Sequence, residues 1–400
     1  MKIFQINTTL NWGSTGRIAE EIGILIQEKG NESYIAYGRF SNPSQSKIYH
    51  IGNKFDFFYH AIQTRLYDKH GLASQKATKK LINYIKEVQP DIIHLHNIHG
   101  YYVNYKILFD YLSKVKIPIV WTLHDCWSFT GHCAYYSFIK CNRWETGCHH
   151  CVQKKSYPAT YLFDNSLNNF KKKKKVFTSL NRLTIVPVSN WLAEEVKKSF
   201  LNEYPIHVIH NGIDLDVFKP NTNFRTICNT NNSFTILGVA SVWEKRKGLT
   251  DFIQLRSYLS NDYTIILVGL SKQQIEKLPQ GIIGIQRTNC IQELVDLYSA
   301  ADVFFNPTWE DNFPTTNLEA LACGTPVITY KTGGSVEAID EQTGFVVEQG
   351  DLETTVQILK RLKSEGKEKY KFPCRQRAVR LYNKNERYEE YIQLYNSLLK

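Results

Sequence analysis

The sequence predicts an α/β protein built from two doubly wound, parallel-sheet domains. Strand-like apolar runs alternate with amphipathic helical stretches along the chain, a pattern typical of parallel sheets covered by helices. The chain has 400 residues, of which 42% are hydrophobic, and this length favours two domains over one. A stretch rich in Asn, Thr and Pro, residues 214–233, separates two series of strands and is the predicted linker.

Each expected strand is followed by a helical period or a tight turn, as at residues 15–28 and 76–87. The strands expected in the first series are residues 2–7, 33–38, 91–97, 118–125 and 183–189, and in the second series 234–241, 263–270, 281–286, 302–307, 326–330 and 344–348. The helical pattern of residues 380–400 has no strand after it, so we expect it to pack back on the first domain. The expected domains are therefore residues 1–208 with 380–400, and residues 209–379.

Residues 308–334, TWEDNFPTTNLEALACGTPVITYKTGG, carry the most informative pattern. An acidic loop follows a strand, and a helix is expected to begin at Pro314 or Thr315. Free backbone N–H groups at such a helix start can bind a diphosphate. Asp311 and Glu319 flank this start, so one carboxylate can accept hydrogen bonds from sugar hydroxyls and the other from ribose hydroxyls.

This segment resembles the signature of glycosyltransferase family 4, retaining nucleotide-sugar enzymes with the GT-B fold of two facing Rossmann-like domains. The family pattern is a glutamate, seven residues, then Glu-Ala, an apolar pair and Cys-Gly-Thr-Pro-Val, and residues 319–327 match it. The first acidic position is Asp311, which keeps the spacing and is the expected contact of the donor sugar; Glu310 beside it is the alternative. The resemblance implies further donor contacts at Pro314, Thr315, Thr316, Asn317 and Glu319.

Two further motifs extend the resemblance. NWGSTGRIAEEI looks like the family's loop after the first strand, where Gly13 and Gly16 let the backbone approach the donor phosphates. Residues 207–218, HVIHNGIDLDVF, are similar to the family's Asn-Gly-Ile-Asp element at the domain junction. Asp214 and Asp216 lie in a turn there and are expected to be structural instead of metal ligands.

A basic pair opens the second domain. Residues 238–253, GVASVWEKRKGLTDFI, resemble the family segment in which an arginine and a lysine bind the diphosphate and offset its growing charge as it leaves. Lys247 and Gly248 match the family's Lys-Gly pair. Val242 occupies the usual arginine position, so the arginine role is assigned to Arg246.

Several histidines follow strands of the first domain. His124 and Asp125 resemble the family's His-Asp element near the anomeric carbon and the acceptor. Such a histidine can hydrogen-bond a donor-sugar hydroxyl or position the acceptor, and the alternative is a histidine satisfied within the core. His94 and His96 share one strand face, and with His99 they are expected to have structural or acceptor-side roles instead of binding a metal.

Five of nine cysteines lie between positions 126 and 151. Cys148 and Cys151 form a C-x-x-C, with Cys133 and Cys141 upstream. Four thiolates at these spacings suit a structural zinc ion, and disulfides are disfavoured in a reducing cytosol. The insertion resembles one in the capsule and exopolysaccharide (colanic-acid-type) subgroup of these transferases.

The cysteine pattern leaves alternatives open. The thiols could be free or form a thiol switch, and a histidine could replace one cysteine ligand. Cys126 lies apart from the other four and is expected to pack in the core. The histidines that could serve as ligands are His132, His149 and His150.

A formal net charge of +11 and a pI of about 9.0 predict attraction to polyanions without choosing among nucleic acid, anionic lipid and phosphorylated substrates. The run Lys171 to Lys175 could seat a helix on the anionic inner face of the cell membrane, or it could be a solvated helix face. No apolar run approaches the roughly 18 to 20 residues of a membrane-spanning helix, and the start lacks a signal-peptide pattern. A cytoplasmic location is therefore expected.

Together these patterns predict a retaining glycosyltransferase of the hexosyltransferase type. Its donor would be a nucleotide diphosphate sugar, and its acceptor a hydroxyl of a glycan or polyprenyl-linked glycan in bacterial surface polysaccharide synthesis. The resemblance implies front-side attack by the acceptor, with His124, Asp311 and Lys247 as catalytic residues and no catalytic metal. The alternatives are another GT-B enzyme, such as a nucleotide-sugar epimerase or a phosphorylase, and a zinc-containing nucleic-acid-binding protein.

Overall fold

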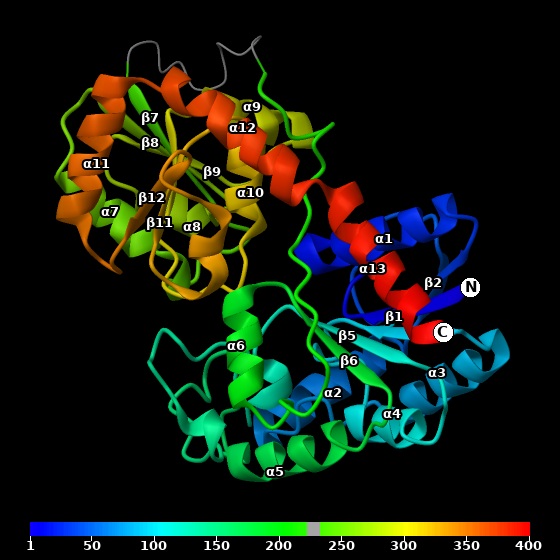
Figure 1. Ribbon diagram of the computed structural model, residues 1–400. Helices are drawn as coiled ribbons and strands as arrows, with labels where there is room; N and C mark the ends of the chain where they lie inside the picture. Colours follow the sequence, from blue (N-terminus) through cyan, green and yellow to red (C-terminus); the bar gives the residue numbers. More distant parts are fainter. Residues whose placement is uncertain (222–232) are drawn as a thin grey trace. The chain divides into compact units, whose positions relative to one another are not determined.

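The computed structural model describes residues 1–221 and 233–400. The chain divides into two compact units, unit 1 (residues 1–210 and 387–400) and unit 2 (residues 211–386). Each contains a six-stranded parallel sheet with helices around it, as the sequence predicts (Figure 1). Most of the predicted linker, residues 222–232, lies outside the described residues. Over the described ranges, no helix is long and apolar enough to cross a membrane.

The sheet of unit 1 has the strand order β3-β2-β1-β4-β5-β6, with every neighbouring pair parallel. The direction of winding reverses between β1 and β4, and ligands of doubly wound sheets bind at the carboxyl ends of the strands near such a point. The sequence did not reveal β3, because this short strand is mostly exposed and lacks an apolar run. The strands are β1 (Lys2–Asn7), β2 (Glu32–Tyr37), β3 (Lys47–His50), β4 (Ile92–Leu95), β5 (Ile119–Leu123) and β6 (Leu183–Pro187).

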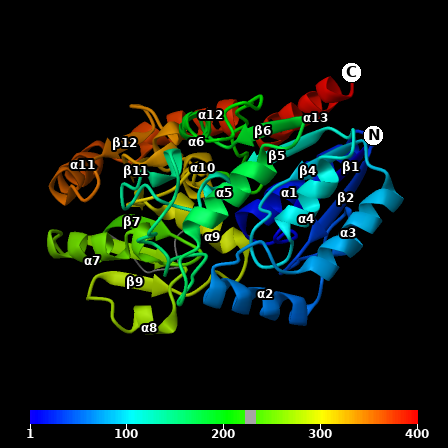
Figure 2. The ribbon, with the colours of Figure 1, turned by 90° about the horizontal axis from the view of Figure 1, so that it is seen from below.

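Helices cover this sheet, and one buried cluster joins the first helix of the chain to the last. Ile18 and Ile22 from α1 are buried with Tyr391 and Tyr395 from α13, against Val120 of the sheet. The helix α2 was not expected from the sequence and runs along the periphery of unit 1 (Figure 2). The helices are α1 (Gly13–Glu28), α2 (Lys54–Tyr67), α3 (Gln75–Val88), α4 (Tyr105–Leu112), α5 (Ser166–Phe177), α6 (Asn190–Lys198) and α13 (Lys384–Leu399).

The last helix, α13, also supplies hydrogen bonds to the sheet of unit 1. The hydroxyl of Tyr395 lies 2.7 Å from Nδ1 of His94, and the hydroxyl of Tyr391 lies 3.0 Å from Oγ1 of Thr122. All four side chains are buried, so these bonds satisfy polar groups that would otherwise destabilise the core. The C-terminal helix thus returns to the first unit, as expected.

Unit 2 repeats the arrangement with the strand order β12-β11-β10-β7-β8-β9, again parallel throughout. Its winding reverses between β7 and β10, the positional equivalents of β1 and β4. Its carboxyl-end edge is therefore a second place where a ligand is expected. The strands are β7 (Phe234–Val239), β8 (Tyr263–Val268), β9 (Ile282–Ile285), β10 (Val303–Asn306), β11 (Val327–Tyr330) and β12 (Gly344–Val347).

Within unit 2, the entering and leaving segments of the chain are joined by a β-bridge. The N–H of Ile213 donates to the carbonyl of Tyr382 at 2.7 Å, and the N–H of Lys384 donates to the carbonyl of Ile213 at 3.1 Å. The helices of unit 2 are α7 (Leu249–Ser257), α8 (Lys272–Ile275), α9 (Ile291–Ala300), α10 (Thr315–Ala322), α11 (Leu352–Glu365) and α12 (Glu368–Tyr382).

Candidate active site

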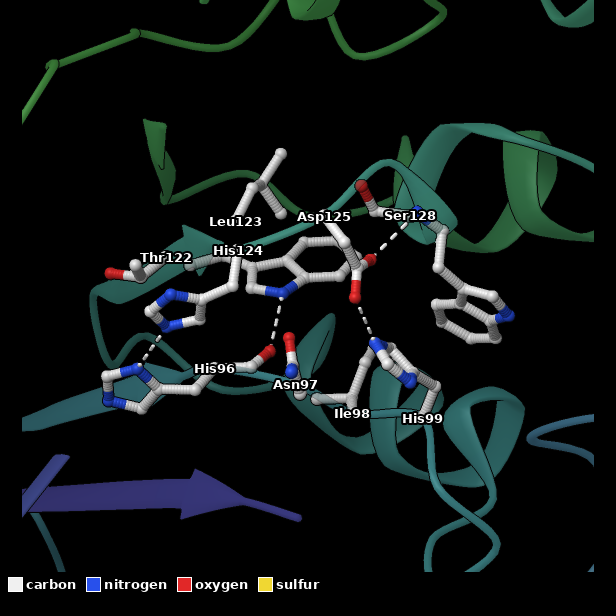
Figure 3. Close-up of a pocket in the computed structure, with 11 residues that line it drawn as sticks. His96, Asn97, Ile98, His99, Thr122, Leu123, His124, Asp125 and Ser128 are labelled. Carbon is white, nitrogen blue, oxygen red and sulfur yellow. Dashed lines mark hydrogen bonds and ion pairs between the residues drawn. The ribbon is translucent and has the colours of Figure 1, made fainter. Parts of the chain in front are cut away.

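A pocket lies at the carboxyl ends of β4 and β5 in unit 1 (Figure 3). Both predicted acceptor-side residues, His124 and Asp125, line it, because they directly follow β5. The loop after β4 supplies the opposite wall. The lining residues are His96, Asn97, Ile98, His99, Trp121, Thr122, Leu123, His124, Asp125, Trp127 and Ser128.

Asp125 is held by two hydrogen bonds on this pocket wall. Its Oδ1 accepts from the N–H of Trp127 at 2.9 Å, and its Oδ2 lies 2.8 Å from Nε2 of His99. The other ring nitrogen of His99 lies 2.9 Å from the hydroxyl of Tyr157. Burial alone would raise the pKa of Asp125, but the charge and hydrogen bond of His99 outweigh it and lower that pKa. Asp125 is therefore an anion that orients His99.

A chain of hydrogen bonds fixes the proton positions of His96 and His124. Nε2 of Gln5 donates to the carbonyl of Ala19 at 2.9 Å, so Oε1 of Gln5 faces Nε2 of His96, also at 2.9 Å. An amide oxygen only accepts, so Nε2 of His96 carries the proton and Nδ1 accepts. Nδ1 of His96 lies 3.2 Å from Nε2 of His124, which must then be the donor.

Burial keeps these rings neutral. It lowers the pKa of His96 well below its ordinary value and lowers the pKa of His124 to about 4. With the proton of His124 on Nε2, its Nδ1 is a hydrogen-bond acceptor. The ring of His94 contacts that of His96 in a tilted arrangement with centroids 4.0 Å apart, and it bonds Thr122 and Tyr395, which is a structural role. The pocket can therefore accept a hydrogen bond from a substrate hydroxyl at His124.

The two predicted loop glycines have different surroundings. Gly13 begins α1 with φ +64, and a Cβ added there would meet nothing within 4 Å. A Cβ on Gly16 would lie 2.7 Å from Oγ1 of Thr9 and 3.2 Å from the backbone nitrogen of Asn11. Gly16 therefore allows the loop to close on α1, while only Gly13 leaves open space beside the backbone.

In unit 2, a basic turn after β7 meets the acidic loop after β10. Nζ of Lys247 lies 2.5 Å from Oδ2 of Asp311, and Nη1 of Arg246 donates to the carbonyl of Glu310 at 3.1 Å. Gly248 follows the turn with φ +77, and a Cβ there would lie 2.2 Å from the carbonyl oxygen of Pro307. Gly248 of the family-like Lys-Gly pair is thus required by the close approach of the two loops, and Lys247 joins them through its ion pair with Asp311.

The acidic candidates of this edge differ in accessibility. Glu310 is 3% exposed, whereas the side chain of Asp311 is 15% exposed. Glu319 is also 3% exposed, and its Oε2 accepts from the hydroxyl of Tyr298 at 2.8 Å. Glu319, predicted as a donor contact, is therefore deeply buried and bonded within unit 2.

Helix α10 begins at Thr315 with Pro314 as its N-cap, as the sequence predicts, and no side chain caps it. Thr315 and Thr316 are partly exposed at this start. Asn317 is fully buried: its amide nitrogen donates to Ser335, and its oxygen accepts from Asn306 at 2.8 Å. The backbone N–H groups of the first turn and the threonines can contact a ligand, whereas the side chain of Asn317 supports the loops.

The aspartates of the D-x-D at the unit boundary do not form a metal site. Oδ1 of Asp214 accepts from the N–H groups of Asp216 and Val217, and its Oδ2 pairs with Lys384 at 2.5 Å. This is a turn closed by its own carboxylate, which agrees with the structural role expected for it.

The predicted zinc site at Cys133, Cys141, Cys148 and Cys151 is not supported. The four cysteines do line one pocket, but in the described part of the chain no group of three or more His, Cys, Asp or Glu side chains is arranged to hold a metal ion. A hydrogen bond to Cys151 and burial raise the pKa of Cys133, and burial raises the pKa of Cys148 to about 11. These two cysteines are therefore thiols in the metal-free protein, whereas a cysteine that binds zinc must be a thiolate.

The histidines considered as substitute ligands do not complete a metal site in the described residues. Nδ1 of His132 lies 2.7 Å from Oδ1 of Asp68, and Nδ1 of His149 lies 2.9 Å from the carbonyl of Gly147, whereas Nε2 of His132 is buried without a hydrogen-bond partner. Cys spacing alone does not report where the sulfur atoms point, and this is why the sequence suggested a closed metal site.

Sequence reasoning missed three polar contributors to the unit 1 site. Gln5, Tyr157 and Tyr395 each bond a histidine of the cluster. One signal was present: Gln5 interrupts the buried apolar strand KIFQIN, and a polar side chain in such a strand needs a partner. The tyrosines gave no comparable signal.

Two doubly wound units with polar edges at their switch points define the GT-B class of glycosyltransferases. Family models match both halves: "Glycosyltransferase Family 4" over residues 16–217 and "Glycosyl transferases group 1" over residues 233–365. The chain belongs to glycosyltransferase family 4, and it is a glycosyltransferase. This membership decides against the nucleic-acid-binding alternative.

Similar proteins agree with this assignment. WcaC of Escherichia coli K12, assigned to colanic acid biosynthesis as a glycosyl transferase, is 24% identical over the whole of both chains. The capsular polysaccharide biosynthesis glycosyltransferase CapM of Staphylococcus aureus is 24% identical over 48% of this chain and 54% of its own.

Solved structures show the same fold. Sucrose-phosphate synthase from Thermosynechococcus elongatus has a TM-score of 0.72 at 15% identity, covering 99% of this chain and 98% of its own. HepE of Anabaena, in complex with UDP-glucose, has a TM-score of 0.67 at 14% identity, covering 99% and 100%.

Proposed function

We propose that the protein transfers a hexose, with retention of anomeric configuration, from a nucleoside diphosphate sugar to a hydroxyl of a glycan or polyprenyl-linked glycan. The observation that carries this proposal is the ion pair of Lys247 and Asp311 at the switch point of unit 2. A cation and a carboxylate in one place suit a donor that has a charged diphosphate and a hydroxyl-rich sugar.

In this scheme unit 2 binds the donor. Lys247, Arg246 and the first turn of α10, with Pro314, Thr315 and Thr316, contact the diphosphate and stabilise its charge as it leaves. Asp311 accepts hydrogen bonds from the sugar, since Glu310 is the more buried of the two carboxylates. Glu319 is assigned to the ribose from its spacing to Asp311 and not from its exposure, which is as low as that of Glu310. Asn317 supports α10, and HepE supplies the precedent of a UDP-sugar bound by this fold.

In this scheme unit 1 contacts the donor sugar and binds the acceptor. The neutral His124, accepting at Nδ1, bonds a hydroxyl of the donor sugar, and Asp125 acts through His99 on the acceptor side. Gly13 gives the donor phosphates an approach to the backbone, with Gly16 closing that loop. No carboxylate is assigned as a covalent nucleophile, so the acceptor hydroxyl attacks from the face that the diphosphate leaves.

The biological setting proposed is bacterial surface polysaccharide synthesis at the cytoplasmic side of the cell membrane. The names of WcaC and CapM support it, since both refer to polysaccharide biosynthesis. A polyprenyl-linked acceptor would bring the enzyme to the membrane, and residues 171–175 offer positive charge for such contact.

The proposal is tested with a panel of nucleoside diphosphate sugars. At least one should raise the melting temperature of the protein, since a ligand that binds only the folded state stabilises it. Slow hydrolysis of that donor without acceptor should first release the sugar in the donor's own anomeric form, read by proton NMR before mutarotation. Stabilisation by none of the panel would exclude the donor class, and an inverted first product would exclude retention.

A further inference from the structure

Unit 1 carries an apolar surface that the proposed reaction does not use. On α2, Phe55 is 85% exposed, Phe58 is 63% exposed and Tyr59 is 56% exposed, and Ile62 is exposed one turn further on. The spacing i, i+3, i+4, i+7 puts these four side chains on one face of the helix. A helix of a globular domain normally turns such a face inward.

A loop far away in sequence continues this surface. Tyr161, Leu162 and Phe163 are all more than half exposed. The ring of Phe163 stacks on that of Tyr67, the last residue of α2, with centroids 5.8 Å apart, and the N–H of Tyr161 donates to the carbonyl of Arg65 at 2.7 Å. We call the whole set the aromatic surface: Phe55, Phe58, Tyr59, Ile62, Tyr67, Tyr161, Leu162, Phe163 and Leu167.

Positive charge surrounds the aromatic surface. Residues 53–69 and 152–175 contain three acidic side chains, Asp56, Asp68 and Asp164. Each accepts a hydrogen bond from a nearby backbone N–H, that of Asn53, Asn165 and Cys151 respectively. Helix α5 begins beside the end of α2, because Nδ2 of Asn165 donates to the carbonyl of Tyr67 at 2.7 Å. The exposed basic residues of these segments are Lys54, Arg65, Lys69, Lys155, Lys171, Lys172, Lys174 and Lys175.

We propose that the aromatic surface docks unit 1 on an anionic phospholipid bilayer. Exposed fractions this high mean that the rings protrude instead of lining a groove, and protruding rings suit the headgroup layer, where Phe and Tyr bury apolar area and Tyr keeps its hydroxyl in water. The surrounding lysines attract anionic headgroups at about 1 kcal/mol each near the surface.

The apolar part of this surface comes mainly from α2 and the loop 161–163, and the lysine-rich helix α5 adds only Leu167. On α5, Phe170, Lys173 and Phe177 are buried, and Nζ of Lys173 donates to the carbonyl of Trp127 at 2.6 Å. The outward face of α5 is therefore cationic with Leu167 at its start. Helix α2 thus supplies most of the inserted apolar side chains, and helix α5 supplies positive charge.

The test is co-flotation with vesicles of phosphatidylcholine alone or with 30% phosphatidylglycerol added, a composition chosen at roughly the charge density of bacterial membranes. The wild-type protein should bind the anionic vesicles and dissociate from them as the salt concentration rises, because salt screens the attraction between the lysines and the anionic headgroups. The double variant Phe55→Ser, Phe58→Ser should bind at least about tenfold more weakly. Lys171→Gln with Lys172→Gln should weaken binding by roughly thirtyfold, because two lysines at about 1 kcal/mol each are removed.

The matched control is Phe372→Ser, at a side chain of unit 2 that is 71% exposed, and it should bind as wild type does. Stabilisation by UDP-glucose, or by the donor found in the panel, should be equal in all variants, which separates this proposal from the proposed reaction. Absence of binding to anionic vesicles, or an equal loss in Phe372→Ser, would overturn it. A concentration-dependent dimer that the Phe55→Ser, Phe58→Ser variant abolishes would also overturn the proposal, because a second copy of the chain would then cover the aromatic surface.

Discussion

The sheets of the two units share one strand order, but the residues that follow their strands differ in kind. All 12 histidines of the chain lie within residues 1–210, and residues 211–386 contain none. The edge of unit 1 carries the neutral rings of His96 and His124, whose protons are fixed by hydrogen bonds, beside one carboxylate, Asp125; the edge of unit 2 carries the ion pair of Lys247 and Asp311. One topology thus serves two chemistries: accepting hydrogen bonds from hydroxyls, and compensating the charge of a phosphate.

The largest effect should come from removing the cation of unit 2. Lys247→Ala should lower turnover by about 10³-fold, or about 4 kcal/mol of transition-state stabilisation, because a leaving diphosphate depends on local positive charge. Lys245→Ala is the matched control: it removes an exposed lysine of the same turn, and turnover should change less than about twofold. Steady-state kinetics with the preferred donor measure both. If Lys247→Ala raised only the KM for the acceptor and left turnover unchanged, Lys247 would not stabilise the leaving diphosphate, and the proposed difference between the two edges would be wrong.

A second prediction concerns acid stability, which should differ between the units. Burial lowers the pKa of His60 and His94 to about 3, so below pH 6.5 the unfolded chain binds more protons than the folded one. The stability that these two neutral rings contribute to unit 1 is therefore fully present above pH 6.5. It is lost as pH falls toward 3, by about 1.4 kcal/mol per pH unit for each ring. Unit 2 has no histidine to contribute such a loss.

Hydrogen exchange with mass spectrometry at pH 7 and pH 5, corrected for intrinsic rates, checks this difference. Peptides from β4 and β5 should lose protection, and peptides from β7 and β8 should not lose it through this route. His94→Gln should reduce the loss in unit 1, whereas Gln at the exposed position His149 should leave it unchanged. Equal losses of protection in both units would contradict the assignment of acid sensitivity to buried histidines.

The smallest effect concerns proton placement. Gln5→Met removes the oxygen that fixes the proton of His96, so His124 should become a mixture of tautomers and turnover should fall by roughly three- to tenfold. Two-dimensional NMR of ¹⁵N-labelled histidine rings reads the tautomer directly, and every histidine signal arises from unit 1. Ile3→Met changes packing in the same buried strand and should leave the spectrum of His124 unaltered. A single, unchanged tautomer in Gln5→Met would refute the hydrogen-bond chain.

Local patterns in the sequence were sufficient to predict the fold and the start of α10. The run of apolar strands separated by helices determines the doubly wound class, and Pro314 followed by Thr315 marks the helix start that the structure has. The strand β3 was not predicted because it is short and mostly exposed. The helix α2 was not among the predicted elements, although its apolar residues recur at helical spacing.

The partners within the site were beyond sequence reasoning, because they depend on tertiary contacts. Gln5 and His96 are 91 positions apart, and Lys247 and Asp311 are 64 apart. Pattern reasoning identified most of the side chains but not which of them meet. The cysteine cluster illustrates this: the four residues do line one pocket, but no three of the His, Cys, Asp or Glu side chains in the described residues are arranged to hold a metal ion.

The route of the chain makes the two sites depend on different parts of the sequence. Unit 2 is one continuous segment, and its ends are joined by the bridge of Ile213 to Tyr382 and Lys384. Unit 1 is discontinuous and needs α13, whose Tyr391 and Tyr395 complete the hydrogen bonds beneath the histidine pocket. The cationic edge is thus built from one stretch of chain, whereas the histidine edge relies on a helix whose Tyr395 lies 301 positions further along the sequence than its partner His94.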